Sequence, residues 1–153
     1  MFDIKLVGDI PHKRYVKKYV KDILHHFFGN RVKRSIPIKI KLYDYLDGNQ
    51  GLCIGSRNYV DIELAKKIQG KSNRKRKPTL DQLLETLAHE LVHAKQFIRG
   101  EINQRNLIWR GARGPYDCKR LSYKRTPWER EAYSQEKDLK ITYWDKQYKQ
   151  LLK

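Results

Sequence analysis

Cysteine and long hydrophobic runs are both scarce in this chain of 153 residues. The two cysteines, Cys53 and Cys118, are too few to build a disulfide framework, which favours a reducing compartment. No apolar run approaches the ~20 residues of a membrane-spanning helix, and the first residues lack the basic and apolar regions of a secretion signal. We therefore expect a cytoplasmic protein with no membrane partner, located in the host cytoplasm if it is viral.

Acidic residues are also in short supply, because 17 Asp and Glu stand against 34 Lys and Arg, and the formal net charge is +17. Such a charge favours polyanions, with nucleic acid as the first candidate partner and an acidic protein surface as the second. Two segments are especially basic: residues 71–77, from Lys71 to Lys77, and residues 105–125, from Arg105 to Arg125. Both are candidate phosphate-contacting surfaces. The first could equally be a solvated linker, and the second a loop that packs on its own domain beside the cleft.

The chain is long enough to bury a core, and we expect one domain over residues 1–153. Alternating apolar and polar residues predict strands, and apolar residues at helical spacing predict helices. The expected strands cover residues 2–7, 36–45, 52–54 and 58–64, and the expected helices cover residues 11–28, 79–100, 126–139 and 141–152. The predicted fold class is α+β. A small mixed or antiparallel sheet packs against the first helix and the helix over 79–100, and a C-terminal helical region follows.

The helix over residues 79–100 carries the clearest chemical signal. Thr79 suits its start and Gly100 its end, and it contains His89-Glu90-Leu91-Val92-His93, an H-E-x-x-H motif. The two imidazoles lie slightly over one turn apart on one face, where they can bind one metal ion. Glu90 can then reach a metal-bound water as a general base. Two such histidines can also be ordinary polar residues, but their apolar neighbours would make unpaired imidazoles costly to bury. The motif therefore predicts a Zn²⁺ site.

The third zinc ligand has to come from another part of the chain. A catalytic zinc usually takes three protein ligands, and no histidine follows His93. The ligand is therefore a carboxylate, a cysteine or one of the upstream histidines, which are His12, His25 and His26.

The best candidates lie in residues 127–133, PWEREAY. Glu129 and Glu131 point to nearly opposite sides of a helix, so only one of them can face the metal. We favour Glu129, because the small Ala132 one turn away would let two helices approach closely. However, Thr126-x-x-Glu129 is itself a capping-box pattern. If Glu129 caps the helix, Glu131 takes the ligand role.

With HELVH followed by a later helix that carries E-x-E-A, the sequence resembles the zincin metallopeptidases, specifically the gluzincin type with a downstream Glu ligand. It is similar to small bacterial and phage metallopeptidases of the ImmA/IrrE-like group. Its order of elements also resembles the SprT-like domain, whose third ligand is a downstream histidine. The resemblance implies a zincin-like fold with His89, His93 and Glu129 on Zn²⁺. It also implies that the strand before the metal helix, residues 58–64, forms the rim of the cleft and pairs with extended substrate.

The expected function is that of a zinc metalloendopeptidase in which Glu90 activates the attacking water. Tyr133, Tyr123 and Arg113 could assist the carbonyl oxygen, on the basis of position alone. The positive charge suggests a protease that acts on proteins bound to nucleic acid; a regulatory peptidase that cleaves one partner is a further possibility. The alternative from another class is a basic nucleic-acid- or protein-binding module with a structural or inactive zinc site. Glu90 favours the enzyme, because a purely structural site has no need of this residue.

Overall fold

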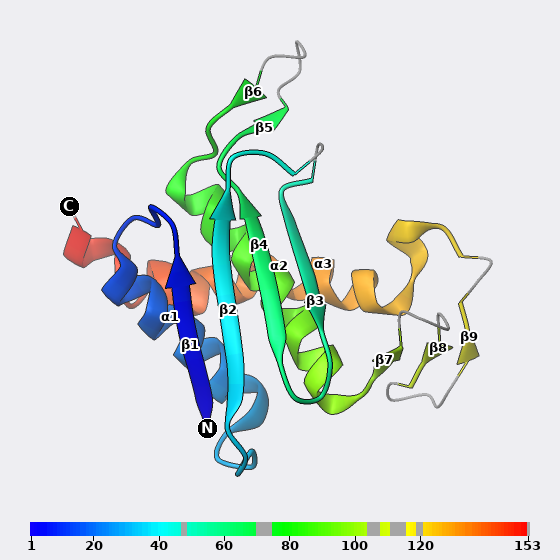
Figure 1. Ribbon diagram of the computed structural model, residues 1–153. Helices are drawn as coiled ribbons and strands as arrows, with labels where there is room; N and C mark the ends of the chain where they lie inside the picture. The colour runs from blue at the N-terminus through cyan, green and yellow to red at the C-terminus, as the bar shows by residue number, and fades with distance from the viewer. Residues whose placement is uncertain (47–48, 70–74, 104–107, 111–115, 119–120, 153) are drawn as a thin grey trace.

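The computed structural model describes residues 1–46, 49–69, 75–103, 108–110, 116–118 and 121–152 (Figure 1). The principal strands are β1 (Phe2–Val7), β2 (Ile36–Tyr43), β3 (Gly51–Gly55) and β4 (Val60–Ala65), and the α-helices are α1 (Lys13–Phe28), α2 (Leu80–Arg99) and α3 (Pro127–Lys140). The fold class is α+β, as predicted, and each of these elements overlaps a predicted one.

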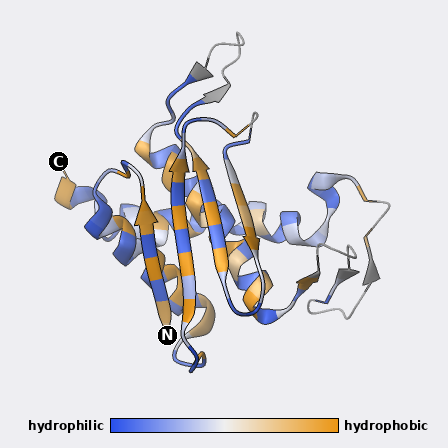
Figure 2. Cartoon of the chain, in the orientation of Figure 1, coloured by the Kyte–Doolittle hydropathy of each residue, from blue (hydrophilic) through white to orange (hydrophobic). Residues whose placement is uncertain are grey.

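Four strands form a mixed sheet in the order β1-β2-β4-β3. Strands β1, β2 and β4 run parallel, and β3 pairs antiparallel with β4. Alternate residues are buried, such as Ile38 and Ile40 on β2 and Ile62 on β4, because successive side chains in a strand point to opposite faces. The helices all lie behind this sheet in Figure 1, and the alternation is visible along β1, β2 and β4 in Figure 2. The other face of the sheet exposes charged residues such as Lys39 and Asp61.

The edge of the sheet differs from the expectation that came with the family resemblance. Residues 58–64 were expected to form the rim of the cleft, but β4 pairs with β2 on one side and with β3 on the other. Within the described residues, β3 has β4 as its only partner and is the edge strand on this side. The rim prediction is therefore wrong for β4, because the chain folds back after β3 and places β4 inside the sheet.

Helix α2 follows its local signals closely. The Thr79 hydroxyl accepts from the Gln82 backbone N–H, and the Gln82 side chain accepts from the Thr79 N–H, so both halves of the capping box are present. Gly100 ends the helix in the left-handed conformation with φ 70°. Helix α1 begins two residues after the predicted Pro11, because the intervening His12 is itself left-handed, with φ 54°.

Helix α3 starts as predicted, with Thr126 before it and Pro127 in its first turn. The Thr126 hydroxyl donates to the Tyr123 carbonyl at 2.7 Å and makes no cap to the helix, so the capping-box alternative for Glu129 does not form. Beyond Lys140 the chain continues as a π-helical turn, η2 (Ile141–Asp145), and a short 3₁₀ turn, η3 (Lys149–Leu152). The buried Trp144 of η2 packs edge-on against Tyr19 of α1.

The two basic segments are only partly described. In the first, Lys75 and Arg76 form β6 (Lys75–Arg76), which pairs antiparallel with β5 (Ile68–Gln69), and residues 71–74 lie outside the described residues. In the second, β8 (Ile108–Trp109) pairs with β7 (Ile102–Asn103) and with β9 (Tyr116–Asp117), and a 3₁₀ turn, η1 (Tyr123–Arg125), precedes α3. Residues 105–107, 111–115 and 119–120 lie outside the described residues.

A single cluster of buried apolar side chains joins the sheet to α1, α2, α3 and η2. The metal motif lies on α2, the helix that contacts both the edge strand β3 and α3. None of the helices in the described part of the chain has the length and apolar character needed to cross a bilayer.

Candidate metal centre

Three predicted ligands meet where α2 packs on α3. His89 Nε2 lies 2.9 Å from Glu129 Oε1, and His93 Nε2 lies 2.9 Å from Glu129 Oε2. The two Nε2 atoms lie 3.2 Å apart. All three side chains are buried. Two helices thus bring two imidazoles and one carboxylate to a single point, as the sequence predicted for Glu129.

This donor set fits one zinc ion. Zinc takes histidine nitrogen and carboxylate oxygen at bonds of about 2.0–2.2 Å, so neighbouring ligand atoms in a tetrahedral site lie ~3.3 Å apart. The observed separations of 2.9 Å and 3.2 Å are close to this value. Three protein ligands also leave one tetrahedral position free, as catalytic zinc sites require.

Each imidazole has a hydrogen-bond acceptor at its Nδ1 atom, on the side of the ring away from Glu129. His89 Nδ1 lies 3.1 Å from Glu136 Oε2, and His93 Nδ1 lies 2.8 Å from Gln96 Oε1. The Gln96 amide nitrogen donates to the Trp128 carbonyl at 3.0 Å, which fixes its oxygen toward His93. Each Nδ1 therefore carries the proton in this network and each Nε2 is directed at the metal position. Such outer partners hold the tautomer and raise ligand basicity in zinc sites.

Without a metal, the pKa values of His89 and Glu129 are shifted in the directions that favour positive charge at the cluster. Burial lowers the pKa of His89, but its hydrogen bonds to Glu129 and Glu136 outweigh this and raise it to about 9. Burial raises the pKa of Glu129, but the hydrogen bonds to His89 and His93 outweigh this and lower it to about 2. At neutral pH the additional proton on His89 therefore occupies the place that a divalent cation would take.

Glu90 lies beside this cluster and is free to act. Burial of its side chain raises its pKa to about 7, against the opposing positive charges of His93 and His89. No hydrogen bond or ion pair joins it to another residue in the described part of the chain. Its oxygens are not among the fully buried polar atoms that lack a hydrogen bond, and the side chain lines the cleft. A pKa near neutrality suits a general base.

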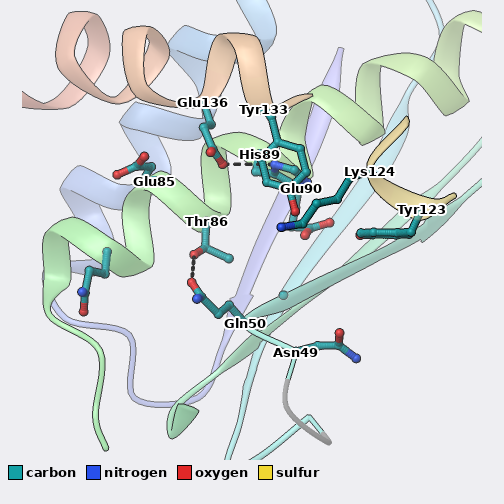
Figure 3. A pocket seen from close by; sticks show the side chains of 12 residues that line it. Asn49, Gln50, Glu85, Thr86, His89, Glu90, Tyr123, Lys124, Tyr133 and Glu136 are labelled. Atoms are coloured by element: carbon teal, nitrogen blue, oxygen red, sulfur yellow. Dashed lines mark hydrogen bonds and ion pairs between the residues drawn. The ribbon is translucent and has the colours of Figure 1, made fainter. Parts of the chain in front are cut away.

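A cleft of about 610 Å³ opens on the site (Figure 3). Its walls are the start of β3, the cleft-facing side of α2, the turn η1 and the side of α3. The lining side chains shown there include Gln50, Thr86, Tyr123, Lys124 and Tyr133. The Thr86 hydroxyl donates to Gln50 Oε1 at 3.3 Å, which ties the edge of the sheet to α2.

Gly51 brings β3 unusually close to the carboxylate of Glu90. A Cβ at this position would lie 2.8 Å from Thr86 Cγ2 and 3.1 Å from both Cγ and Oε1 of Glu90. The strand cannot easily retreat, because Gly51 is in register with Leu64 of β4. A side chain larger than glycine at position 51 would therefore press on both Thr86 and Glu90.

The remaining predicted residues divide into those at the site and those elsewhere. Glu131, the alternative ligand, forms an ion pair with Lys95 and accepts from Gln96, so it stabilises the α2–α3 contact away from the metal position. His12, His25, His26 and the two cysteines are absent from the ligand cluster found among the described residues. Tyr123 and Tyr133 line the cleft, and the Tyr133 ring lies 4.6 Å from that of His89. Arg113 lies outside the described residues.

Three residues that contact the candidate ligands or lie against Glu90 were missed at the sequence level: Glu136, Gln96 and Gly51. Glu136 lies seven residues after Glu129, two turns along the same helix face, and this spacing could have revealed it. Gln96 lies three residues after His93 and is a local partner by the same rule. Gly51 carries no such signal, because it meets the site only through the folding of the chain. Lys124 lies in the basic segment 105–125 that was expected beside the cleft, and it lines the cleft.

Comparisons with protein-family models, with curated proteins and with solved structures find no match to this chain. The assignment of the site therefore rests on the geometry and chemistry of its residues.

Substitution of Glu129 and Glu131, one at a time, tests which of the two glutamates is the zinc ligand. We expect Glu129→Gln to lose most bound zinc, because a neutral amide is a poor zinc ligand and two imidazoles remain alone. Glu131→Gln should keep full zinc stoichiometry, since Glu131 contacts Lys95 and Gln96 instead. Metal analysis after dialysis measures both. Zinc loss in Glu131→Gln but not in Glu129→Gln would show that Glu131, and not Glu129, is the ligand.

Zinc affinity should rise with pH from neutrality to about pH 9, because the pKa of His89 in the metal-free protein is raised to about 9. Below that pH a proton must leave His89 Nε2 when the metal binds. The apparent zinc affinity therefore falls about tenfold for each pH unit below the pKa. Competition with a chelator across this range measures the slope. A flat profile would contradict the assigned protonation.

With Glu90 in its expected role as general base, Gly51→Ala should lower the turnover number, by less than the ~10²-fold that a 1 Å misplacement costs, because the added methyl displaces Glu90 by only a few tenths of an ångström. The added methyl presses on Thr86 and Glu90, whereas the zinc ligands do not touch it. Zinc content and KM should therefore change little. The double variant Gly51→Ala/Thr86→Ser removes the 2.8 Å clash but keeps the hydroxyl, and it should recover part of the activity. An unchanged turnover number for Gly51→Ala would show that Glu90 is positioned in another way.

Proposed function

We propose that this protein is a zinc-dependent metallopeptidase of the gluzincin type, with a zincin-like fold. His89, His93 and Glu129 hold the metal, and Glu90 is the general base. The observation that carries the proposal is the position of Glu90. Its carboxylate lines an open cleft next to three converging ligands, and no hydrogen bond or ion pair joins it to another described residue. A structural zinc site is usually closed by four ligands and has no use for such a group.

The third ligand supports the gluzincin type in particular. Glu129 comes from a helix that follows the H-E-x-x-H helix, as the downstream glutamate does in that group. In the SprT-like domain a histidine takes this place, and the chain has none after His93. The proposed resemblance is therefore stronger to gluzincins of the ImmA/IrrE-like kind.

The residues of the site have separate roles in the proposed peptide hydrolysis. Bound zinc supplies a Lewis acid that polarises the scissile carbonyl and makes water a stronger nucleophile. Glu90 accepts a proton from the attacking water and then delivers it to the nitrogen of the leaving amine. Glu136 and Gln96 hold the imidazoles in the required tautomer throughout.

Donors around the cleft can stabilise the developing negative charge on the carbonyl oxygen. Tyr123 and Tyr133 both line the cleft. Burial and the carboxylate of Glu129 raise the pKa of both phenols, so each keeps its proton and can donate. Lys124 adds a positive charge on the same wall.

The substrate class we propose is a polypeptide in extended conformation. The edge strand β3 borders the cleft and leaves one side unpaired within the described residues, and an extended peptide can add to such an edge. The strong positive charge of the chain favours proteins associated with nucleic acid as the physiological targets.

Glu90→Gln tests the proposal. We expect wild type and variant to bind zinc equally, and casein cleavage to fall by about 10²- to 10⁴-fold in the variant, because the base is lost while the ligands stay. His89→Ala is the control that should lose zinc and activity together. Assays with and without DNA would show whether nucleic acid stimulates cleavage.

Other outcomes would replace the proposal. Zinc in both proteins with cleavage in neither would favour a basic nucleic-acid- or protein-binding module with a structural or inactive zinc site. Absence of zinc from both proteins would show that the cluster is not a zinc site.

A further inference from the structure

Helix α1 presents a dense band of positive charge to solvent. Five exposed residues in its first nine positions are basic, and we call them the cationic face: Lys13, Arg14, Lys17, Lys18 and Lys21. At 3.6 residues per turn they fall within an arc of ~140° on one side of the helix. The opposite side buries Val16, Tyr19 and Val20 in the core, so the cationic face takes no part in packing.

The cationic face has no neutralising partner. In the described part of the chain, none of its five residues forms an ion pair, and Lys18 lies over the ring of Tyr15 at 6.0 Å. Elsewhere the chain does pair its cations, as with Lys95 and Lys140. The nearest acid on the helix, Asp22, accepts a hydrogen bond from Tyr148.

This arrangement weakens the helix that carries it. Lys13, Lys17 and Lys21 follow one another at four-residue intervals, where like charges repel. Lys13 and Arg14 also occupy the first turn, which contains no acid and where the helix dipole disfavours cations. Nothing in the fold compensates for this repulsion among the described residues, whereas a bound polyanion would.

We propose that the cationic face binds the phosphate backbone of double-stranded nucleic acid. From Lys13 to Lys21 the helix advances ~12 Å, a length over which a duplex presents about seven phosphate charges. Binding is independent of base sequence, because the face offers cations and no exposed aromatic ring for stacking. Tyr15 is half-buried against Tyr148 and Tyr19 is fully buried.

The cationic face and the cleft are separate and opposite in charge. No residue of α1 lines the cleft, whose described lining comes from residues 49–51, α2, η1 and α3. The cleft carries the carboxylates of Glu85, Glu90 and Glu136, and Lys124 is the single lysine or arginine among its described lining residues. A polyanion is thus repelled from the cleft and held at α1, which leaves the cleft open to a polypeptide.

Neutralising three of the five residues of the cationic face tests this inference. The variant Lys17→Gln/Lys18→Gln/Lys21→Gln keeps good helix formers and removes three charges. Fluorescence anisotropy of a short labelled DNA duplex, over a series of salt concentrations, measures affinity and its salt dependence. We expect the slope of log K against log salt to become shallower by about 2.7, which is 0.9 for each phosphate that the variant no longer neutralises. Affinity at low salt should fall by tenfold or more.

A matched control removes the same charge elsewhere. Lys67→Gln/Lys137→Gln/Lys146→Gln changes three exposed lysines that form no ion pair with a described residue, and it should leave the slope nearly as in wild type. The α1 variant should also melt at the same temperature as wild type or slightly higher, because repulsion within the helix is relieved.

Three results would overturn the inference. The first is a wild-type protein that fails to bind the duplex at any salt concentration. The second is an equal loss of affinity in both triple variants, which would make binding a property of net charge alone. The third is binding to anionic lipid vesicles through α1 without binding to the duplex, which would assign the face to a membrane surface instead. None of these results depends on peptidase activity.

Discussion

The contact between the Glu129 carboxylate and the imidazoles of His89 and His93 is the interaction on which the site depends. It exists only because α2 and α3 approach closely, and Ala132, with its small side chain fully buried, permits that approach. Lys95 and Gln96 join the same two helices through Glu131 and the Trp128 carbonyl. These polar residues therefore hold the two helices at the separation that brings the three candidate ligands together.

The sheet completes the site from the other side. Strand β3 packs against α2 with a glycine at the point of closest approach, and a larger residue there would meet Thr86 and Glu90. The two imidazoles are oriented by hydrogen bonds, whereas no hydrogen bond orients Glu90 within the described residues. This difference suits the roles proposed for them, because a metal ligand needs a fixed direction and a base must exchange a proton.

Charge is divided between two regions of the molecule. Carboxylates gather around the cleft although the chain as a whole carries +17, and the charged residues among the first nine of α1 are all basic. Burial of Glu90 and Glu129 would strengthen their interaction with a bound metal ion, since the local dielectric is low. Exposure of the cations leaves them available to a partner in solution, where their effect depends on salt.

Local rules were enough to predict α2 and the face on which His89 and His93 lie, because capping and helical spacing involve residues only a few positions apart. The composition likewise determined the excess of positive charge. The choice of Glu129 over Glu131 needed the tertiary structure, because both carboxylates fit a helix and only the packing of α3 on α2 decides which one faces the histidines. The position of β4 inside the sheet and of β3 at its edge also depends on strand pairing between distant residues. No local pattern encodes that order, and it places Gly51 rather than any residue of β4 against Glu90.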